Sequence, residues 1–198
     1  MAEGHQGRAA LIGPNAVLQL LPVISREFGP RRLAVILERA GLAVLPDGSR
    51  MIAEEDAARL HRTLRREEPD AAVRMARDAG RATADYILAH RIPRIVQQVL
   101  KALPAGLAAP LLARAITRHA WTFVGSGRFR CRDSWTFEIT DNPLIRGEHS
   151  PVPLCIWHAA VFERLYATLV ARDCRCAEET CAAQGSGTCR FVIRRGEA

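Results

Sequence analysis

Three cysteines and one glutamate near the end of the chain have the residue types and spacing of a metal site. Glu178 precedes Cys181 by three positions, Cys189 follows eight positions after Cys181, and Cys155 lies upstream at the start of an expected helix. Three thiolates and one carboxylate suit a tetrahedral ion, most naturally Zn²⁺. We predict that these four residues bind a structural zinc ion, because a closed set of four ligands leaves no open position for a substrate.

Alternative ligands and a simpler interpretation remain open at this point. Glu179 could replace Glu178, and Cys174 or Cys176 could replace another ligand, because strand alternation places 174, 176 and 178 on one face. Free cysteines are also common as small buried hydrophobic residues. Four of the six cysteines fall within sixteen residues, which favours a metal site, as does a reducing compartment.

The elements that must position these ligands can be read from the spacing of apolar residues. Residues 1–119 are expected to be mainly helical, and Gly or Pro residues separate the helices. Small residues at Ala72, Ala76, Gly80 and Ala84 form a ridge that predicts a close helix crossing. The expected helices cover residues 14–28, 31–40, 54–66, 69–90, 94–102 and 104–119.

The pattern changes to alternation after residue 119. Residues 121–131 and 135–139 are expected to form two antiparallel strands with a bend at Gly125-Ser126-Gly127. A helix over 151–171, with Pro153 in its first turn, and two short strands at 174–181 and 188–194 complete the chain. The fold class is therefore α/β of the α+β type, in which one domain, 1–198, packs a helical N-terminal half on a small antiparallel sheet and joins a C-terminal helix and hairpin through zinc.

Charge and hydropathy narrow the partners and the location. Lysine and arginine total 28 against 21 acidic residues, which gives a net charge of +7, and Lys101 is the only lysine. The arginines are dispersed over amphipathic helices, so we expect a solvated basic surface and no nucleic-acid partner. Residues 1–8 lack the features of a secretory signal, and charged and Pro residues interrupt the apolar region 99–116. These features predict a cytoplasmic protein with no integral membrane segment.

The spacing of Glu178, Cys181 and Cys189, followed by Arg-Phe-Val-Ile and preceded by Cys155 and a helix, resembles the vinyl-4-reductase domain family. The resemblance implies an α/β small-molecule-binding fold, often dimeric, in which the matching cysteines and glutamate bind zinc. Segments 83–93, 119–127 and 142–148 are similar to the branch of this family from bacteriochlorophyll synthesis, over nearly the whole chain. That branch implies a tetrapyrrole pathway. A Gly-Asp usual before the last cysteine is replaced here by Gly-Ser or Gly-Thr.

The family name implies reduction of a vinyl group, but the residues favour binding. Gly125-Ser126-Gly127 is expected to lead into a strand, whereas a dinucleotide-binding glycine loop leads into a helix. The cysteine spacing matches no ferredoxin pattern. We therefore expect an accessory or carrier protein of bacteriochlorophyll synthesis that binds a porphyrin or Mg-porphyrin intermediate and hands it to a pathway enzyme such as magnesium chelatase. An 8-vinyl (4-vinyl) reductase and a ligand-sensing regulator are the alternatives.

A porphyrin needs apolar walls, cations for its carboxylates and, when metallated, an axial ligand. Aromatic residues on the expected strands could form the walls, His119 could be the axial ligand, and Arg128, Arg130 or Arg146 could pair with carboxylates. Each has a simpler interpretation, since aromatics commonly form the core and His119 shares an apolar face with Leu112 and Ile116. The predicted ligand-binding residues are His119, Trp121, Phe123, Arg128, Trp135, Phe137 and Arg146.

Overall fold

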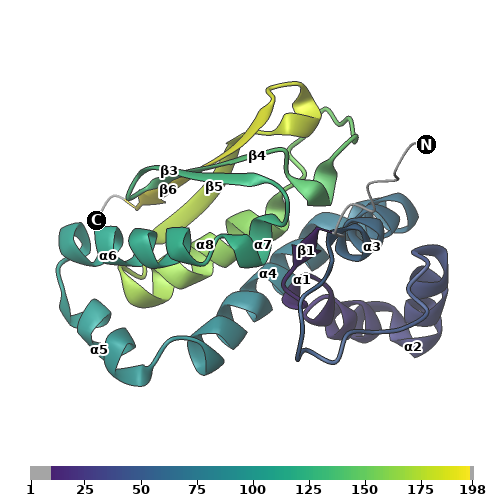
Figure 1. Ribbon diagram of the computed structural model, residues 1–198, viewed down its shortest axis with the longest axis horizontal. Helices are drawn as coiled ribbons and strands as arrows, with labels where there is room; N and C mark the ends of the chain where they lie inside the picture. The colour runs from purple at the N-terminus through teal and green to yellow at the C-terminus, as the bar shows by residue number, and fades with distance from the viewer. Residues whose placement is uncertain (1–9, 197–198) are drawn as a thin grey trace, which may run out of the picture.

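The computed structural model describes residues 10–196, so the expectation for residues 1–8 lies outside the described part. Its first half is helical, as predicted, and most helices begin or end at the expected Gly and Pro residues (Figure 1). The kink at Gly29 falls inside one continuous helix, α2, where Gly29 has a φ of 80°. The helices are α1 (Asn15–Leu18), α2 (Leu21–Arg39), α3 (Glu54–Glu67), α4 (Pro69–His90), α5 (Arg94–Ala102), α6 (Ala105–Arg118), α7 (Trp121–Val124) and α8 (Ile156–Leu169).

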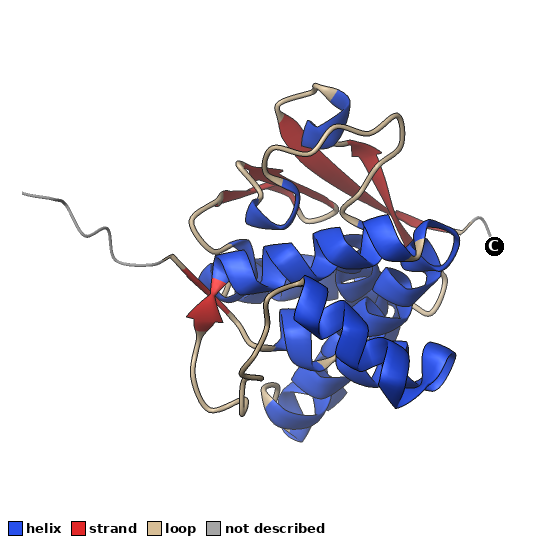
Figure 2. Cartoon of the chain, turned by 90° about the vertical axis from the view of Figure 1, so that its right-hand side faces the viewer, coloured by secondary structure: helices blue, strands red, loops and turns tan. Residues whose placement is uncertain are grey.

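A four-stranded antiparallel sheet follows in the second half, with the strand order β3-β4-β6-β5. The strands form one layer and the helices lie beneath it (Figure 2). Alternate residues of the central strands, Phe137 and Ile139 in β4 and Phe191 and Ile193 in β6, are buried. The strands are β3 (Arg128–Asp133), β4 (Thr136–Thr140), β5 (Cys174–Thr180) and β6 (Thr188–Arg195), and the short helical turns are η1 (Pro143–Ile145) and η2 (Ala182–Gln184).

Helix α8 lies between the sheet and helix α4 and carries much of the core. Trp157, Val161, Leu165 and Leu169 recur along it and are all buried, as predicted. The small ridge of α4 crosses α8 at Gly80, where an added Cβ would contact the Trp157 carbonyl and lie 2.7 Å from the Ala160 Cβ. The predicted close crossing is confirmed, and α8 is the partner helix.

Two expectations about local structure are wrong, and one small sheet was not expected. Trp121 and Phe123 lie in the short helix α7 and not in a strand, so β3 begins only at Arg128. Helix α8 begins at Ile156, because the prolines at 151 and 153 keep the preceding chain out of the helical region, and Cys155 is its N-cap. The unexpected sheet pairs β1 (Leu11–Ile12) with β2 (Ile52–Ala53). Within residues 10–196, no helix combines the length and apolarity needed to span a bilayer.

Candidate functional site

The four predicted metal ligands come together at the N-terminus of α8. The Sγ atoms of Cys155, Cys181 and Cys189 and a carboxylate oxygen of Glu178 all lie within 4.8 Å of one another. The Cys155 and Cys189 sulfurs are 3.3 Å apart. Ligands of a tetrahedral zinc ion lie about 3.8 Å apart when each Zn–S bond is about 2.3 Å long. The ligand atoms are therefore spaced closely enough to share one ion.

Three elements bring these side chains to one point. Cys155 caps α8, Cys189 lies on β6, and Cys181 follows the end of β5. A shift of register between Glu178 and Thr180 bends β5 at the place where it supplies its ligand. Cys174 and Cys176, which share the Glu178 face, lie farther along β5 and outside this cluster, and Glu179 is exposed and pairs with Arg194.

N–H groups surround the cluster. The Cys155 amide donates to Glu178 Oε2 at 2.8 Å, the Leu154 amide donates to Cys181 Sγ at 3.4 Å, and the Asn142 amide donates to Cys155 Sγ at 3.2 Å. Such donors stabilise thiolates, and the N-terminus of α8 adds its dipole. The N–H groups replace the arginines expected here, since Arg190 pairs with Glu138 and Arg175 bonds to backbone carbonyls.

Asn142 is the residue that sequence reasoning missed at this site. It is buried, and its side-chain oxygen accepts a hydrogen bond from the Leu144 amide while its nitrogen donates to the Cys155 sulfur. The available signal was the Asn142-Pro143 pair, which indicates a turn after a strand. That signal predicts the turn but not the direction of the side chain.

The protonation of the four groups indicates a need for a cation. Burial raises the pKa of the Cys155 thiol, and burial raises the pKa of Glu178 to about 8. Hydrogen bonds from Cys155 and then Cys189 lower the pKa of Cys181. The hydrogen bond from Cys155 lowers the pKa of Cys189, but contact with Cys181 and burial outweigh it and raise that pKa to about 12. The protein alone thus stabilises one negative charge among four acidic groups.

A second observation supports a metal here. Glu178 Oε1 is buried and accepts no hydrogen bond from any residue between 10 and 196. A buried oxygen without a partner is costly, and a coordinated ion would satisfy it. The donor set, its spacing and this oxygen fit together, so the cluster could hold a metal.

The predicted porphyrin-binding residues do not line one open slot. Phe137 is fully buried, and Phe123 packs against Phe129 and Phe162 with ring centroids 5.4 and 5.7 Å away. Trp135 packs on Tyr166, with ring centroids 5.6 Å apart. These aromatic side chains fill the space between the sheet and α8.

The other predicted residues lie at the surface. Trp121 is 59% exposed, Arg128 is exposed, and His119 is exposed at the end of α6, where its Nδ1 lies 2.9 Å from the Ala115 carbonyl. The interpretation of His119 as a core histidine is therefore wrong. Arg146 pairs with Glu54 at 2.9 Å and with Asp141 at 2.8 Å.

The Gly125-Ser126-Gly127 loop contacts a carboxylate from its own chain. Glu54 accepts hydrogen bonds from the Ser126 amide and hydroxyl, both at 2.7 Å, and a Cβ at Gly125 would collide with this carboxylate. Burial opposes the charge of Glu54, but the bonds from Ser126 and Arg146 outweigh it and lower its pKa. The loop thus joins α3 to the sheet through a buried ion pair.

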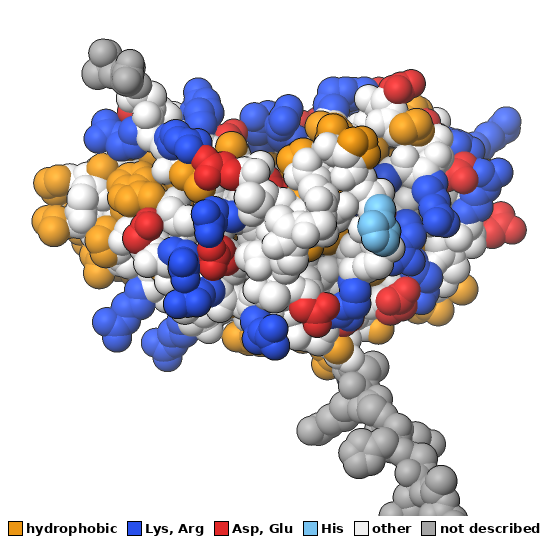
Figure 3. All heavy atoms as spheres, turned by 90° about the horizontal axis from the view of Figure 1, so that it is seen from above, with side chains coloured by type: hydrophobic (Ala, Val, Ile, Leu, Met, Phe, Trp, Pro, Cys, Tyr) orange, Lys and Arg blue, Asp and Glu red, His pale blue; other side chains and the backbone are white. Residues whose placement is uncertain are grey.

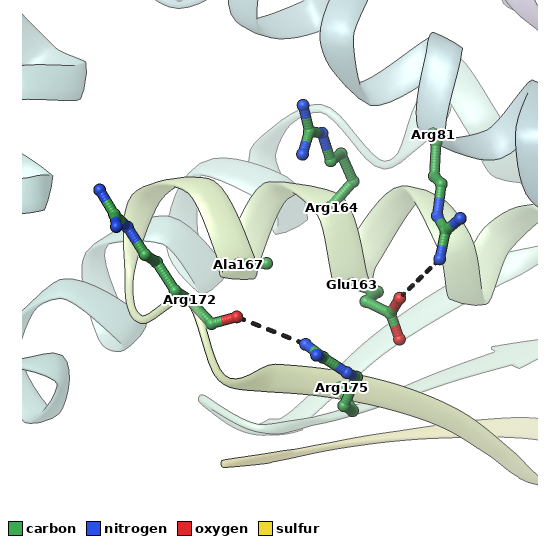
Figure 4. Close-up of a pocket in the computed structure, with 6 residues that line it drawn as sticks. All are labelled: Arg81, Glu163, Arg164, Ala167, Arg172 and Arg175. Carbon is green, nitrogen blue, oxygen red and sulfur yellow. Dashed lines mark hydrogen bonds and ion pairs between the residues drawn. The ribbon is translucent and has the colours of Figure 1, made fainter. Parts of the chain in front are cut away.

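Two hollows lie elsewhere, and none of the seven predicted ligand-binding residues lines either of them. One, of about 360 Å³, lies between α4, α8 and β5. Figure 4 shows that Arg81 and Arg175 approach Glu163 there, while the guanidinium groups of Arg164 and Arg172 point away from it. The other, of about 430 Å³, is lined by His149, Ser150, Pro151, Ala183, Gln184 and Gly185.

Comparison with known proteins defines the class. Residues 135–195, which contain the metal cluster, match the vinyl-4-reductase domain. The whole fold is similar to an H-NOX protein from S. oneidensis in its Fe(II)NO ligation state, with a TM-score of 0.59, 10% identity, and coverage of 94% of this chain and 100% of that one. A structure described as "Probing the function of heme distortion in the H-NOX family" gives a TM-score of 0.56 at 10% identity, covering 94% of this chain and 96% of that one. The protein therefore combines a vinyl-4-reductase domain with an H-NOX-like fold.

A curated relative narrows this class. The chain is 49% identical over 192 residues to the "Bacteriochlorophyll synthase 23 kDa chain" of Cereibacter sphaeroides, which covers 96% of this chain and 93% of the relative. The chain belongs to the family of the bacteriochlorophyll synthase 23 kDa chains.

Proposed function

We propose that this protein binds a tetrapyrrole intermediate and serves as an accessory or carrier protein of bacteriochlorophyll synthesis. The observation that carries the proposal is membership of a family named for bacteriochlorophyll synthase, supported by a relative of nearly full length. Bacteriochlorophyll and its ring precursors are tetrapyrroles. The H-NOX-like fold adds support, because one structure with this fold is described by the distortion of its heme, which is an iron tetrapyrrole. The pathway enzyme that receives the intermediate would be of the magnesium chelatase kind.

The metal in this proposal is zinc, and its role is structural. Cys155, Glu178, Cys181 and Cys189 would hold it, and the closed set supports a link between α8 and the β5–β6 hairpin. Elemental analysis of the purified protein is expected to give one zinc per chain, and Cys181→Ser is expected to lose it. Less than about half an equivalent in the wild type would count against the site.

The exposed residues of the predicted set are the proposed contacts with the tetrapyrrole. Trp121 offers an exposed aromatic face, His119 an imidazole for a ring metal, and Arg128 a guanidinium for a carboxylate. Phe123, Trp135 and Phe137 would support this surface from the core. Arg146 would contact a ligand carboxylate only by giving up its pairs with Glu54 and Asp141.

One titration tests the function. The purified protein is mixed with a divinyl magnesium porphyrin, with and without NADPH, and absorbance is followed. A saturable spectral shift that NADPH leaves unchanged is expected for a carrier. Conversion to the monovinyl spectrum would defeat the carrier role in favour of the reductase, and the lack of any shift would defeat tetrapyrrole binding.

Variants then test the contacts. Trp121→Ala and His119→Ala are expected to weaken porphyrin binding, whereas Val44→Ala, at an apolar residue that is 86% exposed on the loop after α2, should leave it unchanged. Equal affinity in all the variants would place the binding surface elsewhere.

A further inference from the structure

The positive charge of this protein is concentrated in one segment. Residues 86–132 contain eight of the 28 basic residues and none of the 21 acidic ones. The remaining chain therefore has 20 basic and 21 acidic residues, a charge of −1, so this segment accounts for the whole excess of +7. Helices α5 and α6 lie at its centre.

The same two helices expose aliphatic side chains. Ile95 and Val99 of α5 and Leu107 and Leu111 of α6 are each between 51% and 71% exposed. Each pair is spaced by four residues, which places its members on one side of the helix. Figure 3 shows hydrophobic side chains gathered at the left end of the molecule, the end where Figure 1 places α5 and the start of α6.

Basic side chains accompany this apolar surface and lack acidic neighbours. Within residues 10–196, no ion pair forms at any of the five exposed basic residues of α5, α6 and the turn before them, although thirteen other arginines are paired. The five residues are Arg91, Arg94, Lys101, Arg114 and Arg118. We call them, together with the four aliphatic residues above, the α5–α6 surface.

We infer that the α5–α6 surface docks on an anionic lipid bilayer. Aliphatic side chains can enter the boundary between headgroups and acyl chains, while long basic side chains reach the lipid phosphates. The charge selects this occupant, because a second copy of the chain would bring five more unpaired cations against the first five. Nucleic acid would match the cations but leave the aliphatic side chains without a partner. The inference does not depend on tetrapyrrole binding.

Sedimentation with vesicles tests the docking. The full chain is mixed with vesicles of phosphatidylcholine alone or of phosphatidylcholine with phosphatidylglycerol, at low and high salt. We expect it to sediment with the anionic vesicles, and to be released as salt rises because screening weakens the attraction. Failure to sediment with anionic vesicles would overturn the inference.

Variants separate the charge from the apolar contact. Arg94→Gln with Lys101→Gln should weaken the partition onto anionic vesicles roughly fivefold for each charge. Val99→Gln with Leu111→Gln should weaken it at least as much. The matched controls are Arg26→Gln with Arg31→Gln, two exposed arginines of α2, and Val44→Gln. Equal losses in the controls would reduce the effect to net charge or general hydrophobicity and defeat a specific surface.

The oligomeric state distinguishes the main competing occupant. Sedimentation velocity is expected to show the same state for the wild type and for Val99→Gln with Leu111→Gln. A dimer that this double variant converts to a monomer, together with no vesicle binding by the wild type, would assign the surface to a second copy of the chain.

Discussion

The cysteine cluster places four acidic groups where water cannot reach them. The hydrogen-bond donors around it stabilise the thiolate of Cys181 but leave Cys155, Cys189 and Glu178 with raised pKa values. A divalent cation supplies the charge that these donors do not. Metal binding at this site is therefore an exchange of a cation for protons.

We predict that about three protons are released when zinc binds to the metal-free protein at pH 7. Glu178, with a pKa of about 8, and Cys189, with a pKa of about 12, both hold a proton at that pH, and so does Cys155. Because each ligand must lose its proton, the affinity should rise roughly a thousandfold per pH unit below pH 8. Calorimetry in two buffers with different ionisation enthalpies measures the number.

Glu178→Gln is the control for that number, because it keeps the shape of the side chain and removes one proton. Its release should fall to about two. Release of one proton or fewer by the wild type would mean that the thiols do not become ligands.

The four ligands could be predicted because residue type and spacing are properties of the sequence. Their partners could not, since the direction of the Asn142 side chain depends on how the chain turns after β4. Arg190 and Arg175 were plausible neighbours by sequence distance, but Arg190 faces Glu138 across the sheet. Long side chains choose partners in three dimensions, which spacing along the chain does not encode.

Helix α4 carries a glycine that the packing of two elements requires. Gly80 lies in the helix interior, where glycine costs about 1 kcal/mol relative to alanine. Its backbone is close enough to α8 that a methyl group would meet the Trp157 carbonyl and the Ala160 Cβ. Neither is the end of a flexible side chain, so α8 itself would have to move.

We predict that Gly80→Ala lowers the free energy of unfolding by about 1 to 3 kcal/mol, because overpacking outweighs the gain in helix propensity. Gly106, in α6, is the matched control, since an added Cβ there meets no atom within 4 Å. Gly106→Ala should be neutral or stabilise by up to about 1 kcal/mol. Urea unfolding of both variants measures the difference, and equal effects would contradict the close crossing.

The elements that sequence reasoning placed best are those with clear boundaries and enough length to show a period. Helix α4 has the predicted bounds, Pro69–His90, because Pro69 opens it and a long apolar face continues through it. Helix α7 has four residues, too few for a helical period, and its Trp-Thr-Phe-Val sequence favours a strand. The α6–α7 corner, which the sequence does not reveal, overrides that preference.

At the scale of the molecule, one core joins the helices to the sheet. Aromatic residues of α7, β4 and α8, represented by Phe123, Phe137 and Phe162, meet edge to face in its centre. The sequence predicts that these residues are apolar and alternate. Whether they form an open slot or a closed core depends on how near α8 approaches the sheet, which only the assembled fold determines.

Two buried histidines connect distant elements of this core. His61 of α3 donates from Nε2 to the Ala16 carbonyl of α1 at 2.9 Å, and His158 of α8 lies 3.2 Å from the Phe123 carbonyl of α7. Burial lowers the pKa of His61 to about 3, and the charge of Arg65 adds to the effect. Burial also lowers the pKa of His158 to about 4, although its hydrogen bond to Phe123 opposes the shift. Both side chains are neutral in the folded protein.

We predict that the fold loses stability in mild acid because of these two residues. In the unfolded chain each histidine has a pKa near 6.5 and takes up a proton that the folded chain refuses, so stability falls as the pH drops below about 6.5. Between pH 7 and pH 5 each should cost about 2 kcal/mol of unfolding free energy. His61→Gln can still donate to the Ala16 carbonyl but does not titrate, so its loss over this range should be about 2 kcal/mol smaller than that of the wild type. Urea unfolding at both pH values measures the two losses, and an equal loss in the variant and the wild type would show that His61 is already protonated when folded.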